Sequence, residues 1–425
     1  MSIGAASLQG QATNSPDPSP TEATRPGIIT RRGFVQGGVA AVAGVLAGCE
    51  SKQPAGPRRP LPPADQFPRR RLGRNGPLVP ILQQGGDYTY SPRLVKRCMD
   101  LGVRSFDTAE TYARGRSEVY IGRSLAKLRI KREDIFLASK GRPRRPGDIL
   151  AKHLPASLSR LRTDYVDLWY LHELNDPEVL GSAEWRAAVA AAKQEGKTRL
   201  FGLTCHGPRL IEVMKAAARC GWIDAFMFRY NFRSYGDRAL HQAMDTCHRA
   251  GIGMIAMKTQ ASAVSFAERL DPFRRQGFSK HQAVLKTVWQ DHRITTIVSA
   301  MPSVRLVTEN ATAAYDRLSA AEARLLRDYA AATADAYCPG GCGGCRRECE
   351  AALDAPLAVA DILRFLMYHD SYGRRHDARR LFRELPVQRR RLVDVDPSVL
   401  AAAERACPRH LALTTLLPDA VNKLG

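Results

Sequence analysis

The sequence has 425 residues, of which 44% are hydrophobic, so it exceeds one average domain and can bury a sizeable core. Its formal net charge of +22 suits acidic ligands, anionic lipid surfaces or nucleic acid. The sequence contains no nucleic-acid-binding motif, and an arginine-rich, high-GC genome is the better explanation of the charge, so we exclude a nucleic-acid partner.

Residues 1–48 predict a targeting segment rather than part of the fold. Residues 30–35 (TRRGFV) resemble a twin-arginine translocation signal, and the apolar run at 39–48 is too short to span a membrane, which takes about 20 residues. The end of the run, LAGC, resembles a bacterial lipobox, which would make Cys49 the lipidated first residue of the mature chain. We therefore expect a periplasmic or cell-envelope protein with a lipid anchor. An uncleaved anchor is the alternative.

The next two segments predict a tether and a barrel. Residues 49–68 are rich in proline and charge, as in an extended tether. Within 69–330, strand-like runs alternate with amphipathic helical stretches, which predicts a parallel α/β sheet. Eight such units predict closure into a (β/α)8 TIM barrel. The runs are 80–84, 103–106, 135–139, 165–171, 199–204, 225–230, 251–258 and 295–301.

Four polar residues lie at or just beyond the carboxyl ends of three consecutive runs: Asp107, Tyr112, Lys140 and His172. In a βα barrel these strand ends converge on the face that carries the chemistry. A phenol is a poor acid at neutral pH, but a nearby ammonium strengthens it, and a carboxylate can hold that ammonium in place. A histidine can bind the oxygen that receives the proton. Each residue alone would be an ordinary strand-end polar group, but the four in this order predict a proton-donating site.

These residues also carry a family resemblance. Residues 105–118 (SFDTAETYARGRSE) resemble the aldo-keto reductase signature, and the segments LASK, YVDLWYLH, GIGMIAMK and RRLGRNGPLVP are similar to other parts of that family. The resemblance runs from about residue 70 to residue 314. It implies Tyr112 as proton donor, tuned by Lys140 and Asp107, with His172 orienting a substrate carbonyl. It also implies hydride transfer between a nicotinamide nucleotide, usually NADPH, and a small carbonyl or alcohol.

The resemblance further implies a set of cofactor contacts near the ends of the later strands. Residues 298–310 (VSAMPSVRLVTEN) align with the family's phosphate-gripping loop and helix start, where a hydroxyl, backbone amides and an arginine bind phosphate well. Plain helix capping by Ser303 is the alternative. The cofactor candidates are Thr204, Asn231, Lys258, Ser299, Met301, Ser303, Arg305, Glu309 and Asn310.

The sequence departs from the family's pattern in three places. Thr204-Cys205 replaces a Ser-Asn pair, Met227 replaces a Gln, and Ser299-Ala300 replaces a Pro-Gly. Thr204 can still make one hydrogen bond, whereas Cys205 and Met227 are poor substitutes. The alternative function is therefore a non-catalytic barrel that serves as a membrane-tethered binding or redox-relay scaffold.

Residues 331–425 predict a small, mostly helical domain that contains cysteines. Leu357, Ile362, Leu363, Phe365 and Leu366 form an apolar helical face. The tail resembles the C-terminal ferredoxin-type domain found in one branch of the family.

The tail cysteines predict at most one [4Fe–4S] cluster, which would exchange electrons with a partner. Their spacing is C-x3-C-x2-C-x3-C, close to the ferredoxin pattern, with a further Cys-Pro pair near the end of the chain. The fourth ligand would be either the first cysteine or the last. A zinc site and disulfides are the alternatives. The candidate ligands are Cys338, Cys342, Cys345, Cys349 and Cys407.

Overall fold

The computed structural model describes residues 62–86, 90–207, 209–260, 279–332, 338, 348–353, 355–370, 375–392 and 395–425. The expected signal, Cys49 and most of the tether lie outside these ranges, so the interpretation of residues 1–61 stays a prediction. In the part of the chain that the structure describes, no helix is long and apolar enough to cross a membrane.

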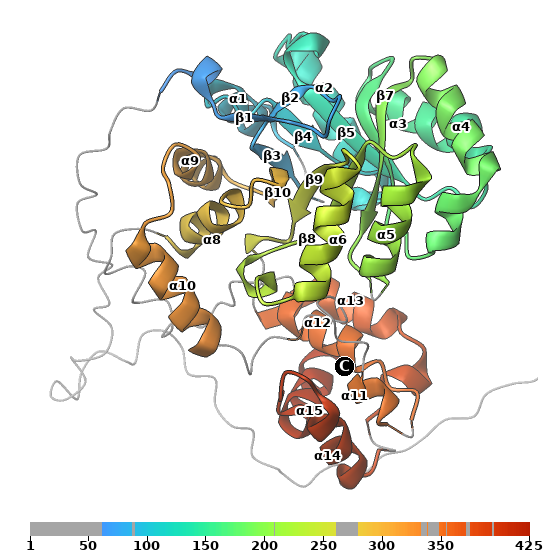
Figure 1. The fold of residues 1–425 in the computed structure, drawn as a ribbon, viewed down its shortest axis with the longest axis vertical. Helices are drawn as coiled ribbons and strands as arrows, with labels where there is room; N and C mark the ends of the chain where they lie inside the picture. The colour runs from blue at the N-terminus through green and yellow to red at the C-terminus, as the bar shows by residue number, and fades with distance from the viewer. Residues whose placement is uncertain are drawn as a thin grey trace, which may run out of the picture. The chain divides into compact units, whose positions relative to one another are not determined.

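Eight parallel strands form a closed barrel, which confirms the predicted TIM-barrel fold (Figure 1). The last strand pairs with the first from Ile297–Leu82 to Ala300–Gly85 and so closes the ring. Each predicted run overlaps one observed strand. The strands are β3 (Leu82–Gly85), β4 (Ser105–Asp107), β5 (Phe136–Gly141), β6 (Val166–Leu171), β7 (Thr198–Cys205), β8 (Ala225–Arg229), β9 (Gly253–Met257) and β10 (Ile294–Ala300).

Helices alternate with the strands along the chain and surround the barrel (Figure 1). Alternate strand residues face opposite sides, so Leu137 packs toward the helices while Ala138 packs inside the barrel. Several helices start at a Ser or Asp whose side chain accepts a backbone N–H, as Ser303 does from Leu306. The helices are α1 (Pro92–Asp100), α2 (Arg116–Lys127), α3 (Leu154–Leu161), α4 (Ala183–Gln194), α5 (Leu210–Cys220), α6 (Arg238–Arg249), α8 (Lys280–Trp289), α9 (Val304–Ala313) and α10 (Ala320–Ala332).

A short antiparallel hairpin, β1 (Arg69–Arg71) and β2 (Leu78–Pro80), precedes the barrel and was not predicted. Its residues Leu72 and Val79 join the apolar cluster inside the barrel. Gly73 has a φ of +69°, and a Cβ there would lie 2.5 Å from the Gly251 carbonyl oxygen, at the start of β9. The hairpin therefore closes the amino end of the barrel, opposite the strand ends that carry the predicted site.

The C-terminal region is helical, as predicted, and has its own apolar core. The predicted apolar face on Leu357, Ile362, Leu363, Phe365 and Leu366 is buried in that core. The region comprises α11 (Glu348–Ala351), α12 (Val359–Asp370), α13 (Arg375–Glu384), α14 (Pro397–Ala406) and α15 (Leu413–Leu424).

Candidate active site

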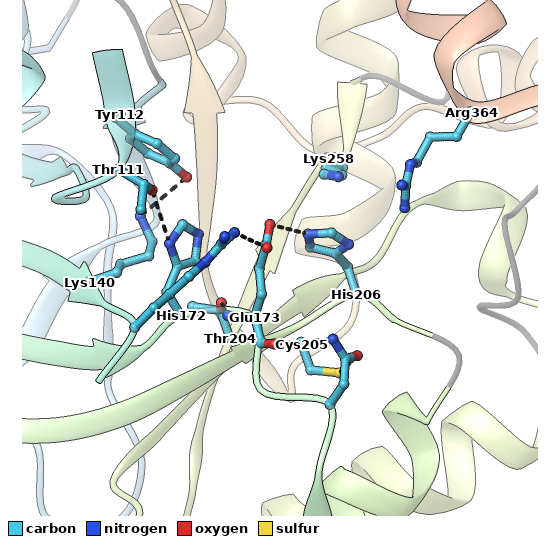
Figure 2. Close-up of polar contacts among 12 residues, drawn as sticks. Thr111, Tyr112, Lys140, His172, Glu173, Thr204, Cys205, His206, Lys258 and Arg364 are labelled. Atoms are coloured by element: carbon cyan, nitrogen blue, oxygen red, sulfur yellow. Dashed lines mark hydrogen bonds and ion pairs between the residues drawn. The ribbon is translucent and has the colours of Figure 1, made fainter. Parts of the chain in front are cut away.

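The structure brings the four predicted catalytic residues together at the carboxyl ends of β4, β5 and β6. Figure 2 shows three of them, Tyr112, Lys140 and His172. Lys140 Nζ lies 2.5 Å from Asp107 Oδ1, 2.7 Å from the Thr108 carbonyl oxygen and 3.5 Å from the Tyr112 hydroxyl. The Lys140 and Asp107 side chains are almost completely buried, whereas Tyr112 is only partly buried. The ion pair therefore lies beneath the phenol, and the phenol is the group that a ligand can reach.

Tyr112 is held by an unusual turn. It follows β4 and opens a short 3-10 turn in which Ala113 and Arg114 have φ values of 49° and 57°. Non-glycine residues rarely adopt this left-handed conformation, and such local strain is common at functional sites. The chain therefore places the tyrosine at a backbone cost that the surrounding packing offsets.

The electrostatics keep Lys140 charged. Burial disfavours its ammonium, but Asp107 and Tyr112 together outweigh burial and raise the pKa of Lys140 above its ordinary value. The same ammonium lies 4.6 Å from the centre of the Tyr112 ring. A fixed positive charge beside a phenol stabilises the phenolate that remains after proton donation.

His172 is neutral at ordinary pH. Burial, helped by the positive charge of Lys140, lowers the pKa of His172 to about 3. Its ring meets the Tyr112 ring edge-on, with centroids 5.7 Å apart, and its Nδ1 lies 3.4 Å from the Thr111 hydroxyl. The Nε2 atom is then the one that can hydrogen-bond a substrate oxygen.

Glu173 and His206 form a second polar pair beside the tetrad, and neither was predicted. Glu173 Oε1 lies 3.0 Å from His206 Nε2, and its other carboxylate oxygen pairs with Arg142. Burial and the neighbouring cation Lys258 lower the pKa of His206 to about 4, so this histidine is also neutral. Glu173 directly follows His172, and His206 lies two residues after Thr204, so closeness in sequence to predicted site residues was the available signal.

Lys258 lies just beyond β9 and contacts the C-terminal region. Its Nζ lies 3.1 Å from the hydroxyl of Tyr368 on α12, and its backbone φ is 55°. Burial alone would raise the pKa of Tyr368, but the positive charges of Lys258 and Arg364 lower it below its ordinary value. Figure 2 shows Arg364 extending from α12 toward His206 and Lys258.

The remaining cofactor candidates divide into exposed and buried groups. Ser303 caps α9, and Arg305 in the first turn is 82% exposed and pairs with Glu309 at 3.4 Å. By contrast, Ser299 and Asn310 are buried and bonded to each other at 3.2 Å and to Gln260 at 2.5 and 3.3 Å. The start of α9 thus fits a nucleotide phosphate, while Ser299 and Asn310 serve the internal structure.

The candidates for the nicotinamide end are also used internally. The Thr204 hydroxyl accepts the Glu173 N–H at 2.8 Å, and Asn231 accepts the Arg233 N–H at 3.0 Å. Met301 is fully buried, and its carbonyl oxygen accepts a hydrogen bond from Gln84. Each of these two side-chain contacts uses an acceptor atom only, so the binding of a carboxamide by Thr204 and Asn231 stays a prediction.

The tail cysteines are only partly described. Cys349 and Cys407 are buried in the C-terminal core and Cys338 packs against it, whereas Cys342 and Cys345 lie outside the described residues. No three His, Cys, Asp or Glu side chains within the described ranges are grouped so that they could hold a metal ion. A metal site in the tail would therefore need at least one ligand from outside the described residues.

Residues 83–325 match the Aldo/keto reductase family, which is more than half of the chain. The chain belongs to the aldo/keto reductase family. One relative is an L-galactose dehydrogenase of Arabidopsis thaliana, 30% identical over 172 residues, which are 38% of this chain and 52% of that protein. The chain thus spans about half the length of this curated relative.

Solved structures of this family share the fold. A thermostable aldo-keto reductase bound to the inhibitor epalrestat is 26% identical, with a TM-score of 0.51, covering 62% of this chain and 99% of that protein. An aldo-keto reductase of Klebsiella pneumoniae in complex with NADPH is 24% identical, with a TM-score of 0.51, covering 61% of this chain and 94% of that protein. The matched part of the chain therefore corresponds to a complete family barrel.

Proposed function

We propose that this aldo/keto reductase interconverts a carbonyl compound and its alcohol with NADP(H) as the hydride carrier. The observation that supports it most directly is the tetrad: a Lys140–Asp107 ion pair lies under the Tyr112 hydroxyl, and a neutral histidine stands beside it. The NADPH bound to the Klebsiella pneumoniae relative supports the choice of cofactor.

In the reducing direction the nucleotide supplies a hydride to the carbonyl carbon. Tyr112 donates its hydroxyl proton to the carbonyl oxygen, so hydride and proton together complete the alcohol. The Lys140 ammonium stabilises the phenolate left on Tyr112, which then recovers a proton from water. His172 binds the carbonyl oxygen through Nε2 and orients it toward Tyr112.

Two groups at the start of α9 would hold the phosphates of the nucleotide. Ser303 and the backbone amides at the start of α9 suit a phosphate, and Arg305 offers a planar guanidinium to a second anionic oxygen.

Replacing Tyr112 by Phe tests the proposal. We expect carbonyl reduction to fall by about 10²–10⁴-fold, because the proton donor is lost, while NADPH binding is retained. Tyr120→Phe, on α2, is the matched control and should keep full activity. Unchanged turnover in the Tyr112 variant would show that the acid is wrongly assigned. A wild-type chain that reduces no carbonyl would favour the scaffold function instead.

We propose, as a second feature, that the tail holds one [4Fe–4S] cluster that exchanges electrons with a partner. Cys338, Cys349 and Cys407 contact one apolar core although Cys407 is far from the other two in the sequence, which supports a shared role. Protein purified without oxygen should contain about four irons and matching sulfide per chain. Cys345→Ala should lose them and Cys247→Ala, inside the barrel, should not. Zinc or disulfides in place of iron would overturn the cluster.

We also propose export by the twin-arginine route and a lipid anchor on Cys49, from the sequence of residues 30–49. Replacing Arg31 and Arg32 by Lys should retain the chain in the cytoplasm. Cys49→Ala should leave it exported but release it from the membrane fraction. Membrane attachment that survives the Cys49 change would point to an uncleaved anchor.

A further inference from the structure

The carboxyl end of the barrel carries a positive charge that the tetrad does not use. Lys258 is partly buried, and its hydrogen-bond partner is the hydroxyl of Tyr368 rather than a carboxylate. Within the described residues Lys258 forms no ion pair. Its backbone adopts the left-handed conformation, which is uncommon for lysine. The chain therefore holds this ammonium in a fixed place without neutralising it.

A second cation reaches the same place from the C-terminal region. Arg364 and Tyr368 lie one turn apart on α12, on the helix face that meets Lys258. Asp361 binds one end of the Arg364 guanidinium at 2.7 Å, while the buried Nε atom finds no hydrogen-bond partner in the described part of the chain. Asp361 thus holds Arg364 in place, and the Nε atom of Arg364 is a further hydrogen-bond donor.

The two cations, Lys258 and Arg364, are linked to the catalytic tetrad through His206 and Glu173. Lys258 and Arg364 both act electrostatically on His206, which bonds Glu173, the residue next to His172. Figure 2 shows Tyr112, Lys140 and His172 on one side of Glu173, with His206 and the two cations toward the other side. Glu173 is itself paired with Arg142, so it does not neutralise the two cations.

We propose that Lys258 and Arg364, with the Tyr368 hydroxyl between them, bind an anionic group of the substrate. The substrate would then be a small aldehyde or ketone that carries a carboxylate or phosphate at the end remote from its carbonyl. The proposal rests on the carbonyl-reducing function and adds to it a helix from outside the barrel. A phosphate of the cofactor is the other source of the same chemistry.

A binding measurement tests the site without turnover. Succinate should raise the melting temperature of the wild-type full-length protein, whereas its neutral diamide, succinamide, should not. Arg364→Gln should abolish the shift and Arg364→Lys should restore part of it. Arg380→Gln is the matched control, because Arg380 lies on neighbouring α13 and pairs with Glu384. Equal stabilisation of the wild type and the Arg364→Gln variant would overturn the site.

Kinetics identify the source of the anion. With NADPH, Arg364→Gln should raise the KM for succinic semialdehyde about tenfold, as expected for the loss of a charge-assisted hydrogen bond, and leave the KM for butanal unchanged. Weaker NADP+ binding, with both aldehydes affected equally, would overturn the substrate assignment in favour of a cofactor phosphate. If the wild type reduces neither aldehyde, the carbonyl-reducing function fails, while the succinate measurement still decides the site.

Discussion

At the scale of single residues, the site combines a buried ion pair with two neutral histidines. Lys140 and Asp107 compensate each other's charge, while His172 and His206 resist protonation because they are buried beside cations. Both features affect the free energy of unfolding. A buried charge destabilises the folded state if its partner is removed, and a histidine that burial keeps neutral makes the folded state less stable at low pH.

Removing one partner of the ion pair should lower the stability of the protein. Lys140→Met should lower the free energy of unfolding by about 3–5 kcal/mol, because it leaves Asp107 buried and uncompensated. The double variant Lys140→Met/Asp107→Leu should regain much of that stability in a denaturant titration and remain inactive. A double variant less stable than the single one would contradict the coupling.

The histidines should make stability depend on pH. In the unfolded chain they take up protons near pH 6.5, whereas in the folded chain the pKa values are about 3 and about 4. Between these limits the unfolded state binds more protons, so stability falls as the pH is lowered from 6.5 to 4. The slope should be about 1.4 kcal/mol per pH unit for each histidine.

His206→Gln checks this assignment. The variant should lose the share of the slope that belongs to one histidine, measured by denaturant unfolding over the same pH range. An unchanged slope would place the protonation elsewhere.

The sequence alone could group the catalytic residues, whereas the cofactor contacts stay predictions, for a physical reason. The carboxyl ends of parallel strands converge on one face of a barrel, so Asp107, Lys140 and His172 could be grouped from strand order alone. Asn310 and Thr204 were chosen by alignment, but whether such a side chain faces a ligand or its own neighbours depends on packing. Arg364 could not be predicted, since nothing local places α12 near the barrel.

At the scale of elements, close packing fixes where the helices lie. On α2, an added Cβ at Gly122 would lie 2.6 Å from the Leu161 carbonyl oxygen at the end of α3. The clash is with backbone, which cannot move aside as a side chain can. Periodicity predicted the strands and helices correctly, but it missed the hairpin, because its three-residue strands are too short to show an alternating pattern.

Gly122→Ala should therefore destabilise the protein, although alanine is ordinarily the better helix former. We expect a loss of about 1–3 kcal/mol in the free energy of unfolding, measured by denaturant titration. Gly181→Ala is the matched control, since a Cβ there meets no atom within 4 Å, and it should be close to neutral. A stabilised Gly122 variant would mean that α2 can move away from α3.

At the scale of the whole molecule, the barrel and the C-terminal helices have separate apolar cores. All four tryptophans (Trp169, Trp185, Trp222 and Trp289) belong to the barrel region. Tryptophan fluorescence therefore reports the barrel alone, while far-ultraviolet circular dichroism reports helices from both regions.

Leu417→Ala should separate the unfolding transitions of the two cores. Leu417 is fully buried in the C-terminal core, so its truncation should cost about 2–5 kcal/mol there. We expect an early circular-dichroism transition in denaturant, with the fluorescence transition unchanged. If both transitions move together, the two cores unfold as one cooperative unit.

The hairpin of β1 and β2 has a consequence for the order of events during turnover. Because Leu72 and Val79 fill the amino end of the barrel interior, the proposed substrate, product and nucleotide would share the entrance at the opposite end. Ligands that share one entrance do not exchange independently, and the one seated deeper enters first and leaves last. Turnover should therefore be ordered, with departure of the deeper ligand setting the pace.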